Sequence, residues 1–199
     1  MIISIDGNIG AGKSDLLAHL VTVFQNRGDI EFFPEPTQEW HELFLAYMKN
    51  MKKYALPFTL EVIRQFGRVK HSTKRHQIVE RHPHTTTHVF NTILKNDNIL
   101  GPADLNIIEE YANVFGWTPD VIIYLDVDDA TCIERVESRG RQGEDQLTYE
   151  YLRAVSFQHD KLYKNILPHV KVYRTTQSAT ETKAQFHARI ATLVTTLLA

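Results

Sequence analysis

The stretch Gly7-Asn8-Ile9-Gly10-Ala11-Gly12-Lys13-Ser14 matches the pattern GxxxxGK[ST] at every fixed position. It follows the apolar run Ile2–Ile5 and opens a segment of helical period, which is the context that this motif requires. Its glycines let successive backbone N–H groups point into one hollow, and the helix N-terminus adds partial positive charge. The stretch therefore predicts a nucleotide site in which Lys13 contacts the β- and γ-phosphates and Ser14 binds Mg²⁺.

Short apolar runs alternate with longer segments of helical period along the whole chain. The expected strands are Ile2–Ile5, Ile30–Phe33, Gln77–Val79, Val121–Leu125 and Val170–Tyr173. The expected helices are Lys13–Gln25, Trp40–Lys49, Phe58–His71, Thr86–Asn96, Ala103–Phe115, Ala130–Arg139, Tyr149–Asn165 and Ala179–Leu198. This alternation predicts an α/β fold with a five-stranded parallel sheet wrapped by helices.

Composition narrows the class of protein. The chain has 199 residues, 22 Lys and Arg against 24 Asp and Glu, and 43% hydrophobic residues, which predicts one globular domain over residues 1–199. The near-neutral charge argues against binding to a nucleic-acid backbone. The single cysteine, Cys132, excludes an internal disulfide and fits a reducing compartment. The sequence shows no signal peptide and no membrane span, so we expect a cytoplasmic protein, with most of its ten histidines at the surface.

Charged residues follow two of the expected strands. Glu35 comes after the second strand, with Trp40 five residues further on, and Glu80 and Arg81 come after the third. Open α/β sheets bind ligands at the carboxyl ends of their strands. A carboxylate there is suited to orient or deprotonate a phosphoryl acceptor, and a guanidinium is suited to bind phosphate oxygens. Each cluster taken alone is equally typical of a surface salt bridge.

Three arginines follow the fourth strand. Arg135 and Arg139 are four residues apart on one helix face, and Arg141 comes after Gly140. Planar guanidinium groups match phosphate oxygens, so we predict an arginine-rich lid over about residues 135–147. The alternative for this segment is a solvated helix end. A nucleotide-binding switch is the non-enzyme alternative for the whole chain, but the sequence has neither the Asn-Lys-x-Asp nor the Asp-x-x-Gly run of GTPases.

These residues together resemble the deoxyribonucleoside kinases, a family that includes cellular deoxycytidine, deoxyguanosine and thymidine kinases and herpesvirus-type thymidine kinases. The resemblance runs from Met1 to about Tyr163, and it includes the run Pro119–Leu125 before the arginines. It implies the P-loop kinase fold and Mg²⁺-dependent transfer of the γ-phosphoryl of ATP to the 5′-hydroxyl of a deoxyribonucleoside in nucleotide salvage. It also implies a homodimer, and the short chain suggests a viral or bacterial source.

The resemblance assigns a role to each matching residue near the phosphates. Glu35 would be the general base for the 5′-hydroxyl, and Arg81 would steady the 5′ end. Glu80 would hold Mg²⁺ together with Ser14. The lid arginines would fold over the phosphates.

The resemblance also assigns residues to the nucleoside. Phe90 would stack on the base and Trp40 would wall the pocket, although without the resemblance both positions are more typical of a helix packed into the core. Glu144 would bond the sugar 3′-hydroxyl, and Tyr47 is the nearest match to the tyrosine that shares this task in the family.

The family's base-reading glutamine is missing, and two matchings of the sequence remain open. Matching Leu56-Pro57-Phe58 puts Thr59 at that position, with Val62, Phe66 and Thr86 lining a pocket like that of thymidine-accepting members. Matching Phe58-Thr59-Leu60 puts Glu61 there, with Arg64 and Arg68 facing the base, and a carboxylate would suit guanine. Gln65 is a further candidate. We favour the pyrimidine interpretation, and thymidine in particular.

Thymidylate kinase is the alternative enzyme. It shares the phosphate loop, an acidic-Arg strand end and an arginine lid, but its monophosphate acceptor calls for additional cations near the pocket mouth. The Glu35-Pro36 pair with Trp40 favours the nucleoside. Activity on both acceptors stays open.

Overall fold

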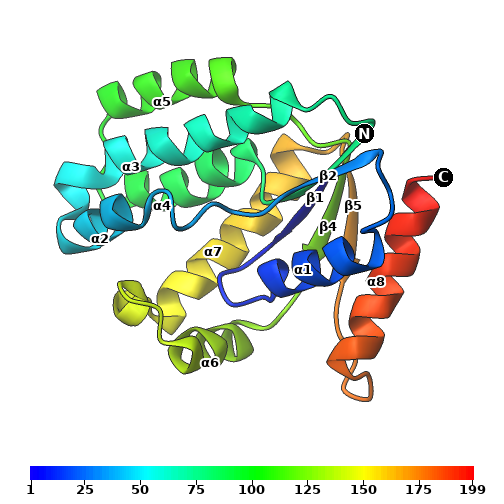
Figure 1. Cartoon of the computed structure of the whole chain (residues 1–199). Helices are drawn as coiled ribbons and strands as arrows, with labels where there is room; N and C mark the ends of the chain where they lie inside the picture. Colours follow the sequence, from blue (N-terminus) through cyan, green and yellow to red (C-terminus); the bar gives the residue numbers. More distant parts are fainter.

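The computed structural model describes residues 1–199 and contains one parallel sheet of five strands in the order β2-β3-β1-β4-β5 (Figure 1). The strands are β1 (Ile2–Gly7), β2 (Ile30–Phe33), β3 (His76–Glu80), β4 (Val121–Leu125) and β5 (Lys171–Thr175). The parallel register pairs Ile5 of β1 with Ile123 of β4 and with Glu80 of β3. The expected α/β fold and its parallel five-stranded sheet are confirmed.

Eight α-helices and four shorter helical segments connect and cover the strands. The α-helices are α1 (Lys13–Val23), α2 (His41–Lys49), α3 (Met51–Phe66), α4 (Asn91–Asn96), α5 (Pro102–Phe115), α6 (Asp129–Arg139), α7 (Tyr149–Lys161) and α8 (Lys183–Leu197). The shorter segments are the 3₁₀ helices η1 (Gly67–His71) and η3 (Glu144–Gln146) and the π-helices η2 (Thr85–Phe90) and η4 (Leu162–Ile166). No helix combines the length and apolar character that crossing a bilayer requires.

Both faces of the sheet are buried, as the alternation along β4 shows. Ile123 and Leu125 belong to the same apolar cluster as Leu16 of α1 and Ile190 of α8. Figure 1 shows these two helices side by side on that face. The intervening Ile122 belongs to a second cluster, with side chains of η2, α7 and η4. Because successive side chains of a strand point to opposite faces, this continuous apolar run fits a strand between two helical layers.

A third apolar cluster joins α2, α3, α4 and α5, which lie together beside the sheet at the upper left of Figure 1. Within it, α3 begins at Met51, seven residues before the expected start at Phe58, and it contains Pro57. The Asn50 side chain caps the helix by accepting from the backbone N–H of Lys53. Burial of Ala55 at 1% exposure and Ile63 at 0% offsets the cost of an interior proline, about 3 kcal/mol.

Two of the expected helices are partly π-helical. The segment expected at Thr86–Asn96 consists of η2 followed by α4, and the segment expected at Tyr149–Asn165 consists of α7 followed by η4. π-helical turns are rare and occur often at functional sites. Here η2 begins at Thr85, four residues after Arg81, and η4 carries Tyr163, whose hydroxyl donates to Asp6 near the end of β1.

We predict that Ile123→Ala lowers the free energy of unfolding by about 2–5 kcal/mol, because it removes buried methyl groups and leaves a cavity between β4, α1 and α8. The matched control is Val114→Ala on α5, where the side chain is 62% exposed and the expected change is within about 0.5 kcal/mol. Urea unfolding of both variants tests this. Equal losses in the two variants would contradict the placement of the core.

Candidate active site

The phosphate loop joins β1 to α1 in a conformation that needs its glycines. Gly10 and Gly12 have φ angles of 82° and 95°, in the left-handed region. A Cβ atom on Gly10 would overlap the backbone carbonyl of Cys132 on α6, so the loop lies directly against that helix. The Asn8 side chain turns away from the loop's hollow and donates to the carbonyl of Leu152 on α7 at 2.8 Å. The loop is therefore held from outside by α6 and α7.

Lys13 is buried within this loop, at 5% exposure. Its ammonium group donates to the carbonyl oxygen of Asn8 at 2.7 Å. Burial, aided by the nearby Arg81 guanidinium, lowers the pKa of Lys13 to about 8, although the carboxylates of Glu80, Glu35 and Asp6 act in the opposite direction. A buried cation of this kind offers strong attraction to a polyphosphate, at a cost to the stability of the empty protein.

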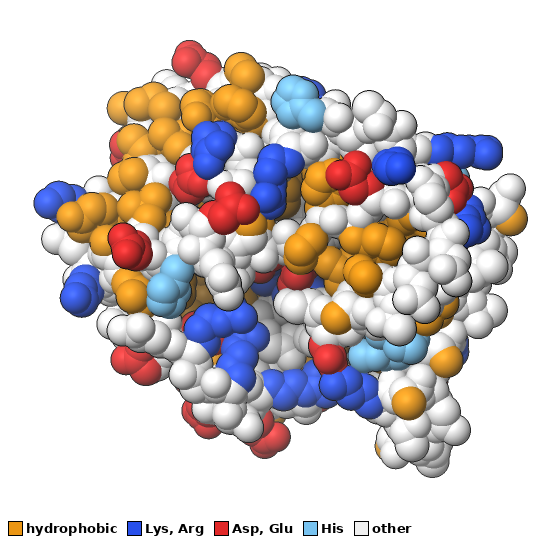
Figure 2. All heavy atoms as spheres, in the orientation of Figure 1, with side chains coloured by type: hydrophobic (Ala, Val, Ile, Leu, Met, Phe, Trp, Pro, Cys, Tyr) orange, Lys and Arg blue, Asp and Glu red, His pale blue; other side chains and the backbone are white.

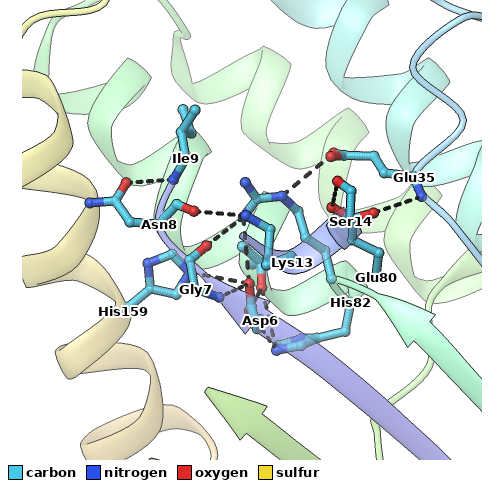
Figure 3. Close-up of polar contacts among 12 residues, drawn as sticks. Asp6, Gly7, Asn8, Ile9, Lys13, Ser14, Glu35, Glu80, His82 and His159 are labelled. Atoms are coloured by element: carbon cyan, nitrogen blue, oxygen red, sulfur yellow. Dashed lines mark hydrogen bonds and ion pairs between the residues drawn. The ribbon is translucent and has the colours of Figure 1, made fainter. Parts of the chain in front are cut away.

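Two carboxylates and a hydroxyl gather beside Lys13. The Ser14 hydroxyl donates to Glu80 Oε1 at 2.7 Å, and the backbone N–H of Glu35 donates to Glu80 Oε2 at 3.4 Å. Figure 3 shows Ser14, Glu35 and Glu80 together on one side of Lys13. Burial, followed by repulsion from Glu35, raises the pKa of Glu80. The Ser14 hydroxyl and Glu80 carboxylate are hard oxygen donors beside a phosphate loop, and they fit Mg²⁺, which binds one or two carboxylates and substrate phosphates.

Arg81 spans the space between the phosphate loop and Glu35. Its Nε lies 3.5 Å from Glu35 Oε1, and its Nη1 donates to the Gly7 carbonyl at 3.1 Å. Its guanidinium also lies 5.1 Å from the centre of the Phe90 ring. Burial opposes the charge, but Glu35, Asp6 and Glu80 together raise the pKa of Arg81. The residue has a φ of 64°, which is uncommon outside glycine and aims this side chain back across the strand ends.

A buried ionic cluster around Asp6 lies directly beneath Arg81. Asp6 is 0% exposed, and its carboxylate accepts from Tyr163 at 2.7 Å and from the Thr85 hydroxyl. His82 and His159 lie 3.2 and 3.5 Å from it, on either side (Figure 3). Burial opposes the ionisation of Asp6, but His159 and His82 lower its pKa well below the usual value.

This cluster was not predicted from the sequence. Several histidines that were expected at the surface are buried, including His82 and His159 at 0% exposure. The reason is that the charge of Asp6 supplies each imidazole with a partner inside the protein. The one available signal was an acidic residue at the end of a strand that was otherwise apolar.

A cavity of about 530 Å³ opens beside these groups and brings most of the predicted residues together. Figure 2 shows a hollow with basic side chains along its rim. Its lining includes the predicted Ile9, Gly10, Gly12, Lys13, Ser14, Glu35, Trp40, Tyr47, Thr59, Val62, Glu80, Arg81, Thr86, Phe90, Arg135, Arg139, Arg141 and Glu144. Gly7, Asn8 and Ala11 belong to the phosphate loop but lie outside the lining.

Glu61 and Phe66 are among the predicted pocket residues that lie outside this cavity. Glu61 accepts from Arg64 and from Gln65, each at 2.7 Å, on the side of α3 that faces away from the cavity. Phe66, one turn beyond Val62, packs edge-on against Trp117 with ring centres 6.0 Å apart. The matching that put Glu61 opposite the base is therefore wrong for this fold, because helical period places Thr59 and Val62 on one face and Glu61 on another.

The other residues that the Glu61 matching assigned to the base also lie outside the cavity. Arg68, the second arginine expected to face the base, forms an ion pair with Glu39 at 2.9 Å. Both Arg64 and Arg68 stay outside the cavity lining, as does Gln65.

The three predicted lid arginines line the cavity, and their side chains have different hydrogen-bond partners. Arg135 Nη1 lies 3.4 Å from the carbonyl oxygen of Gly10 in the phosphate loop. Arg139 makes two hydrogen bonds to Glu144, at 2.7 and 2.8 Å, and Arg141 approaches the same carboxylate at 3.5 Å. Glu144 is 7% exposed. The Glu144 carboxylate therefore pairs with the guanidinium groups of Arg139 and Arg141, which were expected to bind phosphate.

Several lining residues were not anticipated from the sequence. Phe58 stacks on Tyr47 with ring centres 4.9 Å apart and meets Trp40 edge-on at 5.4 Å. Asn91 adds a buried carboxamide. Met48, Met51, Leu94, Asp97, Ile99 and Tyr151 complete this part of the wall. On amphipathic helices such residues carry the same pattern as core positions, so only their tertiary placement distinguishes them.

Comparisons with known proteins agree with this geometry. A family model described as deoxynucleoside kinase matches residues 3–198. "Putative kinase protein 143R" of Invertebrate iridescent virus 6 is 32% identical over 161 residues, covering 77% of this chain and 77% of the viral protein. Human mitochondrial thymidine kinase 2 is 26% identical over 177 residues, covering 80% of this chain and 63% of the human protein.

A solved structure has a closely similar fold. Deoxyadenosine kinase from M. mycoides, determined with the products dCMP and dCDP, superposes with a TM-score of 0.80 at 23% identity. The match covers 99% of this chain and 100% of that chain. The P-loop kinase fold expected from the sequence is thereby confirmed.

We predict that Lys13→Met stabilises the ligand-free protein at pH 7 by about 2 kcal/mol, the lost hydrogen bond to Asn8 included. Since the pKa of Lys13 falls from 10.5 to about 8 on folding, the cost of burying its charge is complete below pH 8 and vanishes toward pH 10.5. The advantage of the variant should therefore shrink as pH rises through this window. Urea unfolding at pH 7 and pH 9.5 measures it.

The control for this experiment is Lys52→Met, which changes an exposed lysine in α3. We expect no gain in stability from it at either pH. A destabilised Lys13→Met protein at pH 7 would contradict the assignment of Lys13 as a strained buried cation.

Proposed function

The chain belongs to the deoxynucleoside kinase family, whose members are ATP-dependent phosphotransferases, and on this premise we propose that it phosphorylates the 5′-hydroxyl of a pyrimidine deoxyribonucleoside in nucleotide salvage. Thymidine is the first candidate. One observation carries the proposal: Glu35 and Arg81 stand between the phosphate loop and the aromatic wall of a single cavity. In that position the two side chains are able to contact both the phosphate donor and the acceptor hydroxyl.

Glu35 is the proposed base. Its carboxylate accepts the proton of the 5′-hydroxyl as that oxygen bonds to the γ-phosphorus and the bond to the β-phosphate oxygen breaks, which leaves the electron pair on ADP. Arg81 holds this carboxylate through its Nε at 3.5 Å and directs the rest of its guanidinium toward the strand ends. Arg81 therefore orients the base and offers positive charge to the transferring phosphoryl group.

The phosphate loop and the lid surround the triphosphate in this proposal. Lys13 exchanges the Asn8 carbonyl for phosphate oxygens, and residues 135–147 close as the lid. Arg139 and Arg141 then exchange the Glu144 carboxylate for phosphate, because both anions suit a planar guanidinium. Arg135 already lies beside the loop. The exchange frees Glu144 to bond the sugar 3′-hydroxyl together with Tyr47.

Ser14 and Glu80 are the proposed magnesium ligands. Their oxygens are 2.7 Å apart at the start of α1, which suits one shared cation. When bound there, Mg²⁺ would neutralise charge on the phosphate oxygens of the nucleotide. The Glu35 backbone N–H holds the other Glu80 oxygen, and this contact fixes the carboxylate relative to the base.

The far end of the cavity supports a pyrimidine. Thr59 and Val62 on α3 line the cavity together with Phe90 and Thr86 on η2, and apart from Phe66 this includes the set expected from the matching to thymidine-accepting members. The similarity to a human thymidine kinase points in the same direction. We further propose a homodimer acting in the cytoplasm and a viral source, the latter supported by the similarity to an iridescent-virus protein.

We predict ATP- and Mg²⁺-dependent phosphorylation of thymidine or deoxycytidine when these two, deoxyadenosine, deoxyguanosine and thymidine monophosphate are assayed in parallel. Lys13→Ala serves as the blank, because it removes the cation that contacts the phosphates. Transfer to the monophosphate alone would replace the proposal with a thymidylate kinase. Nucleotide binding without transfer to any of the five would refute the assigned acceptor chemistry.

Glu35→Gln should lower kcat for the best nucleoside by about 10²–10⁴-fold, because glutamine keeps the size of the side chain but does not accept the proton. The Kd for ATP should stay within about twofold, since the phosphate loop is untouched. The matched control is Glu39→Gln, four residues along the chain, where the carboxylate pairs with Arg68 outside the cavity. If both variants retained full kcat, Glu35 would not be the base.

A further inference from the structure

Thr59 of α3 and Asn91 of α4 meet at the nucleoside end of the cavity. The Thr59 hydroxyl donates to the Oδ1 of Asn91 at 3.2 Å. Both residues line the cavity, with exposures of 3% and 1%. The Asn91 Nδ2 has no hydrogen-bond partner in the protein. A buried, unpaired N–H group is costly, so its retention at this place points to a ligand atom that completes it.

The free hydrogen-bonding positions of the pair can be counted. When the Thr59 hydroxyl donates to Asn91 Oδ1, the threonine oxygen remains an acceptor and Nδ2 remains a donor. When the Asn91 carboxamide rotates by half a turn, its Nδ2 donates to the Thr59 hydroxyl oxygen. The Thr59 hydroxyl hydrogen then becomes a free donor, and Asn91 Oδ1 remains an acceptor. Either arrangement offers a ligand one donor and one acceptor. The rotation reverses their order.

The two pyrimidine bases present the corresponding edges in opposite order. Thymine offers a donor at N3 and an acceptor at O4, whereas cytosine offers an acceptor at N3 and a donor at N4. A fixed side-chain pair would fit one of these edges and leave unpaired polar groups against the other. A pair that reverses its own order fits both.

We propose that Thr59 and Asn91 together determine base specificity by reading the N3 and C4 edge of a pyrimidine in either sense, so that thymidine and deoxycytidine are both substrates. This inference rests on the proposed function and deepens it. The two side chains share the task that a single glutamine has in the family. Under the matching of Leu56-Pro57-Phe58, Thr59 takes the position of that glutamine, and Asn91 supplies the carboxamide from the neighbouring helix α4.

The surroundings favour this pair as the reader of the base edge. Phe58, Val62 and Leu94, from the same two helices, are apolar and offer no hydrogen bond. Thr86 on η2 is the nearest polar alternative along the chain, but a lone hydroxyl cannot supply both hydrogen bonds in the required geometry. Asp97 also lines the cavity, at the end of α4, and it is exposed to solvent.

Asn91 also lines a second cavity, of about 500 Å³, together with His84 and Asn113. In a competing explanation, the Asn91 carboxamide binds a ligand in the second cavity and not the base. Asn113 of α5 lines the second cavity alone, so it provides a matched control with the same chemical change.

The test is kcat/KM for thymidine and for deoxycytidine in the wild type, in Asn91→Asp and in Asn113→Asp. The wild type should use both nucleosides within about tenfold of each other. A carboxylate at position 91 accepts but cannot donate, so it fits only the base that presents its donor to position 91, while the Thr59 hydroxyl turns to donate to the neighbouring base atom. Asn91→Asp should therefore change the ratio of the two kcat/KM values by at least about tenfold. Asn113→Asp should leave that ratio unchanged.

A second variant covers the case in which the buried carboxylate prevents folding. Thr59→Val keeps the shape of the side chain and removes one of the two hydrogen bonds to either base. We expect KM to rise about tenfold for both nucleosides with kcat nearly unchanged, which distinguishes lost base contacts from a general structural defect. The control is Thr87→Val, since the Thr87 hydroxyl donates to the backbone carbonyl of Pro83 and lies outside the nucleoside cavity.

Two results would overturn the inference while leaving the proposed pyrimidine kinase activity intact. They are a wild-type preference above about a hundredfold for one pyrimidine, and equal loss of both kcat/KM values in Asn91→Asp. Failure of the proposed function looks different, because the wild type would then phosphorylate purine nucleosides only, or no nucleoside at all.

Discussion

The buried carboxylate of Asp6 is the constraint on which the rest of the active site depends. It lies at the end of β1, where the phosphate loop begins, and its own side chain accepts from the backbone N–H of Gly7 at 2.8 Å. Because an ionised group without water needs partners on every side, it draws together His82 after β3, His159 of α7 and Tyr163 of η4. The ends of β1 and β3 and the junction of α7 with η4, which are far apart in the sequence, are therefore fixed to one point beneath the site.

The balance of buried charges around Asp6 explains how the site contains costly buried ions and still folds. Lys13 and Arg81 are buried cations, and Asp6, Glu35 and Glu80 supply the negative charge that surrounds them. The opposing shifts in pKa, down for Lys13 and up for Glu80, show that burial outweighs this mutual compensation for both residues. Such groups carry out their chemistry in a polar environment that is already organised, which is the main source of electrostatic catalysis. The stability lost there is offset by the apolar layers on both faces of the sheet.

The arginine segment illustrates how one set of side chains serves two states. In this structure Glu144 satisfies Arg139 and Arg141, so the segment is ordered by an internal anion. A triphosphate offers the same guanidinium groups more charge and more acceptor oxygens. The same carboxylate therefore stabilises the arginines before the nucleotide binds and becomes available to the sugar afterwards, in the mechanism that we propose.

The sequence by itself determined the parallel sheet and the phosphate loop, because both depend on local patterns. Apolar runs of strand length alternate with helical periods, and the conformation of Gly7–Ser14 follows from glycine positions within one loop. The ends of the expected strands located Glu35 and Arg81, and the family resemblance assigned their roles. Tertiary structure alone decided that Thr59 rather than Glu61 faces the cavity, since the packing of α3 fixes its rotation.

Tertiary structure also decided which polar residues share a buried site. Pro57 lies inside a helix against its intrinsic preference, because burial of its neighbours outweighs the local cost. The contact between Thr59 and Asn91 joins residues 32 positions apart, and those between Asp6 and α7 or η4 join residues more than 150 apart. No local pattern encodes such pairs. They depend on long-range packing, which brings distant side chains within hydrogen-bond distance only after the layers of the fold have assembled.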